Sequence, residues 1–297
     1  MTSSTDDLSV LTNEVSAQQK SNIVKATQRK MINLLFKYSA IFWFIAILLG
    51  QWFFFYYIMA FYGFSVINDN IEIWNRWEAF GSTPFKVGDT MGNTVFAVHA
   101  IGAGIVAFGG ALQLLPKLRA LAPKLHKING YIYLVTVFGL ALSGFYLTWV
   151  RGASPDLLAA IGTSVNGFLI LGFAYLTVKT ARAKQFNNHR KWAVRLFLVS
   201  NAQWFLRVGV FSYLITGTML GGNPAFGDIF FTIWTFACFL LPLGMAELYF
   251  IADKKKGLKL KLLATAILVL LTVLMLVGVV GLTPFLLQVL SGGPISL

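Results

Sequence analysis

The sequence predicts an all-α integral membrane protein, a bundle of seven transmembrane helices with a cytoplasmic N-terminus and a C-terminus outside. Two observations lead to this fold class: seven long apolar runs, and basic residues that gather on alternate connections between them. A helix needs ~20 mostly apolar residues to cross a bilayer, and each run reaches that length. With 57% hydrophobic and only 12% charged residues, the chain also has too little polar surface for a soluble globular domain.

Two regions follow from the pattern: residues 1–30, a polar cytoplasmic tail predicted to be disordered, and residues 31–297, the seven-helix domain. The tail has no apolar stretch near its start, so it does not resemble a signal peptide. The aromatic first span suits lipid contact and interfacial anchoring. The predicted spans are Ile41–Phe64, Thr94–Leu115, Ile128–Val150, Leu157–Val178, Trp192–Ile215, Phe226–Ile251 and Leu262–Pro284.

The orientation follows from the lysines and arginines of the connections. Connections 116–127, 179–191 and 252–261 are strongly basic, whereas the alternating ones hold only Arg76, Lys86 and Arg151. Because basic loops stay on the cytoplasmic side, the N-terminus is predicted inside and the C-terminus outside, in a bacterial inner membrane. The net charge of +13 is spread over these loops, which favours anionic lipid headgroups as the partner and disfavours nucleic acid.

Several kinds of chemistry are excluded at once. Cys238 is the single cysteine and lies in an apolar run, so neither an intramolecular disulfide nor a thiolate metal cluster is expected, and no metal site is predicted. The chain has no His-Glu-x-x-His zinc motif, no phosphate-binding glycine loop followed by lysine and no Gly-x-Ser-x-Gly nucleophile turn. Any chemistry therefore belongs to the bundle or its two mouths.

The first candidate site is an outer polar cluster formed by His99 and Arg207. His99 lies on a stripe of small residues, which let membrane helices approach closely and would turn the imidazole toward the bundle interior. The alternative is a histidine satisfied by a neighbouring serine or carbonyl. Arg207 either joins a structural ion pair or reaches the outer headgroups. Three acidic residues are placed near the same mouth: Asp89, Asp156 and Asp228.

A polar stripe on the fifth span connects this cluster to the inner face. His189 and Arg207 are eighteen residues apart, five turns of a straight helix and ~27 Å along its axis. Ser200 and Gln203 fall near the same line. The stripe would line a path through the bundle.

The second candidate site is cytoplasmic, where His126 and His189 open spans three and five. Tyr133 follows His126 by two turns and is grouped with it as a cofactor-binding residue. Two imidazoles at one depth suit the axial ligation of haem b or a metal ion. The alternative is that both histidines contact lipid phosphate. Glu247 either transfers protons or pairs with the lysine run that follows it.

At these histidines the chain resembles a bacterial multi-pass membrane family of unknown function. The family's motifs are an early helix-opening histidine, His-Arg-x-x-Gly-x-x-Tyr and His-Arg-x-Trp-x-x-Arg. The resemblance covers about Phe96–Val208, with a family-like core at about 94–216. It departs at Lys127 and Ala193, where the family more often has arginine and methionine. It implies a fold and sites and no activity. The segments that carry it are VHAIGAGIVAFGGALQLLPKLR, LHKINGYIYL and NHRKWAVRLF.

More distantly, the chain is similar to cytochrome b561-type proteins, which hold haems between histidine pairs. Span four has no histidine to partner His99, so only one such haem is allowed, between His126 and His189. Three function classes remain open. The first is a redox protein that uses one b-type haem or a quinol, the second is a transporter of ions, protons or small molecules, and the third is a non-catalytic assembly partner.

Overall fold

The structure is a computed structural model that describes residues 3–80, 83–225, 227, 229–255 and 257–292. Asp228 and Lys256, which entered the sequence-based reasoning, lie outside these residues. The described chain is helical throughout, with loops and no strand. The elements are α1 (Ser3–Ile58), η1 (Met59–Gly63), α2 (Phe64–Ile67), η2 (Ile71–Phe80), α3 (Thr90–Gln113), α4 (Pro116–Leu121), α5 (Pro123–Phe145), η3 (Tyr146–Val150), α6 (Leu157–Arg182), α7 (Phe186–Ser200), α8 (Ala202–Met219), α9 (Ile229–Lys254) and α10 (Leu258–Ser291).

Six helices of the described chain are long and apolar enough to cross a membrane. They contain predicted spans one, three, four and seven and overlap most of spans two and six, whose predicted bounds run two to three residues beyond the helices. The fifth predicted span differs, because it consists of two shorter helices, α7 and α8, that meet at Asn201. The number of crossings and the orientation of the termini stay predictions.

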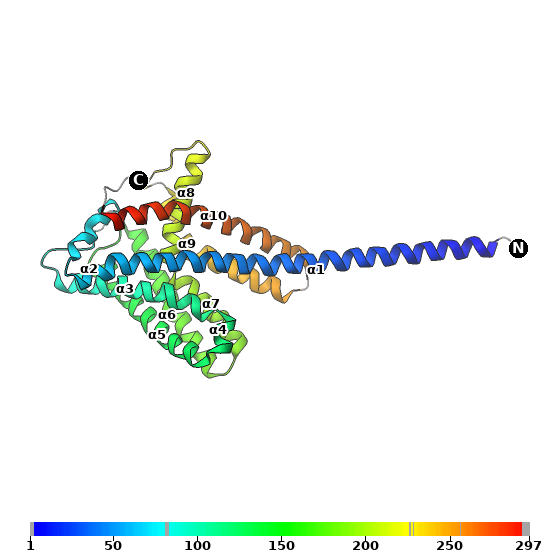
Figure 1. Cartoon of the computed structure of the whole chain (residues 1–297), viewed down its shortest axis with the longest axis horizontal. Coiled ribbons are helices and arrows are strands. Elements are labelled where there is room, and N and C mark those ends of the chain that lie inside the picture. The colour runs from blue at the N-terminus through cyan, green and yellow to red at the C-terminus, as the bar shows by residue number, and fades with distance from the viewer. Residues whose placement is uncertain (1–2, 81–82, 226, 228, 256, 293–297) are drawn as a thin grey trace.

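The N-terminal segment, which the sequence predicted to be disordered, belongs to α1 from Ser3 onward. The first 49 residues contain neither proline nor glycine, so no residue interrupts the helix before the apolar part begins. Figure 1 shows this half of α1 extending well away from the other helices.

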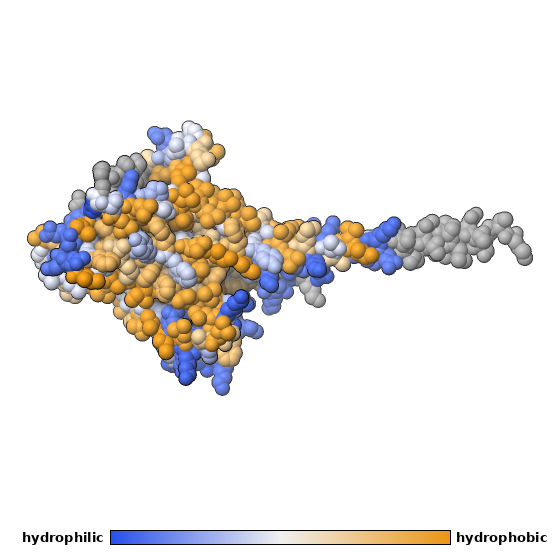
Figure 2. All heavy atoms as spheres, viewed as in Figure 1, coloured by the Kyte–Doolittle hydropathy of each residue, from blue (hydrophilic) through white to orange (hydrophobic). Residues whose placement is uncertain are grey.

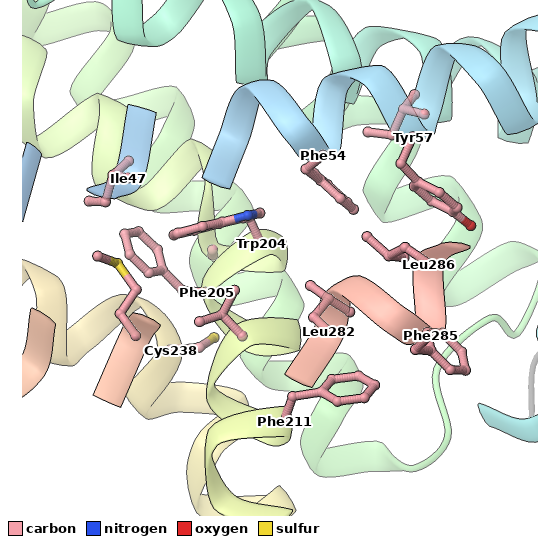
Figure 3. Close-up of a cluster of buried hydrophobic side chains, with 14 of the residues drawn as sticks. Ile47, Phe54, Tyr57, Trp204, Phe205, Phe211, Cys238, Leu282, Phe285 and Leu286 are labelled. Carbon is pink, nitrogen blue, oxygen red and sulfur yellow. The ribbon is translucent and has the colours of Figure 1, made fainter. Parts of the chain in front are cut away.

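Helices α1 and α10 pack side by side and run in the same direction, while α3, α5 and α6 slant away from them (Figure 1). Helix α8 crosses α10 at a steep angle. Glycine makes this crossing close, because the α10 backbone at Gly278 lies against the Val208 carbonyl of α8. Trp204, Phe205 and Leu282 lie in the main hydrophobic core, where α1, α8 and α10 meet (Figure 3).

The outer surface is apolar over most of the bundle, as Figure 2 shows. Many large apolar side chains are exposed on it, among them Leu49, Phe168 and Val280. A soluble monomer rarely exposes apolar surface on this scale, whereas acyl chains cover it at no cost. The surface agrees with a bundle that lies in a bilayer.

Candidate functional site

The break in the fifth predicted span is formed by its own polar residues. The Ser200 hydroxyl donates to the Leu196 carbonyl at 2.8 Å, and the Asn201 amide donates to the Phe197 carbonyl at 2.7 Å. These side chains satisfy carbonyls of the last α7 turn, and serine and asparagine often compete with the helix in this way. Helix α8 then begins at Ala202. The straight stripe predicted from His189 to Arg207 is therefore wrong: Ser200 ends one helix and Gln203 opens another.

Tyr133 of α5 contacts this break. Its hydroxyl lies 2.5 Å from the Ser200 oxygen. Since the Ser200 hydrogen is donated to its own helix, Tyr133 is the donor and Ser200 the acceptor. Tyr133 is buried, and its ring fits against Gly110 of α3, where a side chain would collide with it. Tyr133 thus couples α5 to the end of α7.

The small residues of α3 let α5 approach, as the stripe predicted. The Asn129 amide donates to the Gly109 carbonyl at 2.9 Å, and a side chain at position 109 would meet the Asn129 oxygen. Gly130 packs near the Gln113 side chain, which donates to the His126 carbonyl at 3.0 Å. The motif around His126 is therefore held against α3 by polar contacts as well as by packing.

His99 contacts a serine, which is the alternative that the sequence left open beside a role in the outer polar cluster. Its Nδ1 lies 2.8 Å from the Ser143 hydroxyl of α5. Ser143 donates its hydrogen to the Gly139 carbonyl at 2.8 Å, so it accepts from His99. His99 therefore carries its hydrogen on Nδ1, and its Nε2 keeps a lone pair that can accept a proton.

Arg207 lies on α8 beside α1. Its guanidinium donates to the Gln203 carbonyl at 2.9 Å and lies over the Phe54 ring at 5.6 Å. His99 of α3 and Arg207 of α8 have no hydrogen bond to each other among the described residues, so the outer polar cluster stays a prediction. Among the described residues, no carboxylate forms an ion pair with Arg207.

The end of the bundle predicted to face outward, called the outer mouth below, contains a polar network that the sequence did not predict. Arg151, whose side chain is only 4% exposed, donates to the Asp89 carboxylate at 3.0 Å and to the Asn93 oxygen at 2.6 Å. Asp89 also caps α3 by accepting from the Gly92 amide. That backbone hydrogen bond and the Arg151 guanidinium lower the pKa of Asp89 below its usual 3.8. The clue in the sequence was Arg151, the single basic residue of its connection.

At the end of the bundle predicted to face the cytoplasm, His126 and His189 lie in the first turns of α5 and α7. His189 Nδ1 lies 3.0 Å from the Thr177 carbonyl of α6. A carbonyl only accepts, so His189 carries its hydrogen on Nδ1 and presents a lone pair on Nε2. His126 Nδ1 is buried and has no hydrogen-bond partner among the described residues.

Glu247 pairs with Arg195, so the predicted pairing with the lysine run is wrong. The guanidinium makes two hydrogen bonds to the carboxylate, at 2.6 Å and 2.9 Å. It also stacks over Trp192, 4.3 Å from the ring centre. Helix α7 packs against α9 at this point, and sequence distance alone does not reveal that contact. Arg195, braced by Trp192, thus holds α7 on α9.

Among the described residues, no group of three or more histidine, cysteine, aspartate or glutamate side chains is arranged to hold a metal ion.

Comparison with known proteins gives one match. The model of the family described as "Predicted membrane protein (DUF2306)" matches residues 96–250, just over half of the chain, a range that contains all three histidines. No curated protein and no solved structure matches. The similarity to cytochrome b561-type proteins gains no support from these comparisons. With six membrane-compatible helices and this match, the chain is a multi-pass membrane protein that belongs to the DUF2306 family, whose function is unknown.

Proposed function

We propose that the protein is a membrane transporter of a small anion, coupled to protons, in which the junction of α7 and α8 handles the substrate. The observation that carries the proposal is the helix break at Asn201. Irregular backbone at membrane depth is tolerated only where protein or water surrounds it. In secondary transporters, such discontinuous helices form the substrate site.

The surroundings of the break support this function. Helix α7 is 15 residues long, so the break lies ~22 Å from its cytoplasmic start, well inside a hydrocarbon layer ~30 Å thick. Asn201 is buried, and so is Gln51 of α1, whose neighbour Gly50 lies against Trp204 of α8. Neither polar atom of the Gln51 amide has a hydrogen-bond partner among the described residues. An orphaned amide is costly in an apolar core, which supports a ligand or water near it.

The charge of the outer cluster supports the substrate class. The Arg207 guanidinium has no carboxylate partner among the described side chains, so a bound anion would balance its positive charge. On α3, the Nε2 lone pair of His99 is an acceptor, and in this proposal it takes a proton once a bound anion offsets the Arg207 charge. A carboxylate or phosphate moving with a proton fits both groups.

Flux measurements test the proposal. The protein is reconstituted in vesicles that contain a pH-sensitive dye, and gradients of phosphate, sulfate and succinate are applied in turn. We expect one anion to change the internal pH faster than in protein-free vesicles. Arg207→Gln should slow that rate at least tenfold, because a hydrogen bond to a charged group contributes about 2 kcal/mol.

The matched control is Arg119→Gln, the same change on the exposed surface of α4, which should keep the wild-type rate. Asn201→Ala favours a continuous helix and should slow transport with little loss of folded protein. Equal rates in wild type and Arg207→Gln, or rates no higher than in empty vesicles, would contradict the transport proposal.

A second candidate is a redox protein that binds one haem b or a quinol at His126 and His189. It is favoured by the hydrogen bond from His189 Nδ1 to the Thr177 carbonyl, because such bonds orient ligating imidazoles. Haem would supply one-electron transfer there. Tyr133 contributes less than the sequence predicted, since its hydroxyl is bonded to Ser200.

Absorption spectra separate this candidate from transport. If His126 and His189 hold haem, protein purified after growth with added haem should have a Soret band that His189→Ala abolishes. His99→Ala should keep the band, because His99 lies on the outer half of α3. A protein without this band that still moves an anion would leave only the transport proposal.

A further inference from the structure

A cavity of about 230 Å³ lies between α8, α9 and α10, away from the three histidines. Phe205 of α8 and Cys238 of α9 line it, and Figure 3 shows these two side chains close together. Leu241 lines the cavity and is also exposed on the apolar surface of α9. The cavity is therefore next to the acyl chains, from which an apolar molecule can enter.

One wall of the cavity is a stack of flat aromatic rings. Tyr213 of α8 lies 4.1 Å from Phe230 of α9, with ring planes only 5° apart. Phe230 in turn stacks on Trp234 at 5.5 Å and 14°. Trp234 is fixed by a hydrogen bond from its indole nitrogen to the Leu206 carbonyl and by the missing side chain of Gly209. A planar ligand can extend such a stack, whereas a flexible chain gains little from it.

Two polar groups interrupt the apolar lining. Ser212 lines the cavity and is only 7% exposed, and its hydroxyl has no hydrogen-bond partner among the described residues. Pro242 has no amide hydrogen, so the carbonyl of Cys238, one turn earlier, loses its usual helical donor. The Ser212 hydroxyl is therefore available to a ligand that occupies the cavity.

We propose that this cavity binds the ring of a lipid-soluble quinone, with a ring oxygen accepting from the Ser212 hydroxyl and the tail leaving beside Leu241. The size fits, because an apolar protein cavity of ~150 Å³ already holds a benzene molecule. A quinone has a flat ring for the aromatic wall and oxygens that accept from the Ser212 hydroxyl. Its apolar tail suits the opening beside Leu241. The site is separate from the α7–α8 junction, so it stands independently of the transport proposal.

Tryptophan fluorescence tests the site in the full-length protein. The protein is placed in phosphatidylcholine nanodiscs and titrated with a fully substituted benzoquinone that carries a decyl tail. We expect saturable quenching, which Trp234→Phe reduces and the double change Trp43→Phe with Trp234→Phe largely removes, because both tryptophans line the cavity. Trp149→Phe should keep it, because Trp149 is exposed and does not line the cavity.

Ser212 provides the sharper comparison. Ser212→Ala removes one hydrogen bond and should weaken binding about fivefold, and Ser212→Leu should weaken it further by filling the cavity. Thr218→Ala, on the exposed end of the same helix, should bind like wild type. Thermal unfolding shows which variants are folded. Quenching that does not saturate, equal affinities for Ser212→Ala and Thr218→Ala, or displacement by decanol at the same concentration would overturn the proposal.

Discussion

Arg151 and Arg207 have the same side chain in opposite environments. At the outer mouth, Arg151 is nearly buried and its guanidinium is satisfied by Asp89 and Asn93. Arg207 is only partly buried and contacts Gln203 and Phe54, with no carboxylate partner among the described residues. A cation that is already paired holds helices together, whereas one without a counter-charge is available to a ligand. Under the transport proposal, partner and burial, more than residue type, decide which of the two arginines binds the substrate.

Replacing each arginine by alanine gives the largest contrast. Arg151→Ala leaves a carboxylate and an amide without their donor and should lower the free energy of unfolding by about 2–3 kcal/mol. Arg207→Ala should lower it by less than about 1 kcal/mol, because the residue is partly exposed. Denaturant unfolding in detergent micelles measures both. Equal losses would remove the distinction between the two arginines.

A smaller effect is expected at the second paired arginine. Glu247→Gln keeps the shape of the side chain but removes the charge opposite Arg195. Since the Glu247 side chain is 45% exposed, solvent screens the pair, and the free energy of unfolding should fall by about 1 kcal/mol or less.

Gln203→Glu is the complementary change, since it adds a carboxylate beside Arg207. It should slow anion flux without lowering the melting temperature, and unchanged flux would argue against Arg207 as the anion-binding group.

The smallest effect is a pH dependence at the outer mouth. The pKa of Asp89 is lowered in the folded protein, so its charge stabilises the fold above the unfolded value of 3.8. That contribution is lost as the pH falls through the lower, folded pKa. Between about pH 5 and pH 3, the melting temperature of wild type should therefore fall more than that of Asp89→Asn. Parallel curves would show that Asp89 does not contribute through its charge.

The sequence predicted the helical class and most of the spans, because hydropathy and basic loops are local signals. It did not predict the interruption at Asn201. Hydropathy averaged over a span does not register three polar residues within four positions, 200–203. The adjacent serine and asparagine did indicate a possible helix end, because both side chains compete for backbone hydrogen bonds. Both ion pairs were also missed. Arg195 and Glu247 are brought together by the packing of α7 on α9, which no single-sequence pattern encodes.

The histidines show the same limit. Spacing in the sequence predicted which helix each histidine belongs to and toward which end of the bundle it lies. The serine contact of His99 was one of its two predicted roles. The tautomers of His99 and His189 could not be predicted, because they depend on whether a neighbouring oxygen is a carbonyl or a hydroxyl that has already donated its hydrogen. Haem or quinol at the inner pair, and an anion at the outer cluster, stay proposals.

The length of α1 sets a mechanical constraint. From Ser3 to the start of the predicted first span at Ile41, the helix is roughly 55 Å long, which exceeds the thickness of a lipid headgroup layer several times. No glycine or proline softens this rod. A partner bound at the end of this helix would be held at a fixed distance from the bilayer. A lateral force on that end would be transmitted as a torque to the apolar half of the same helix.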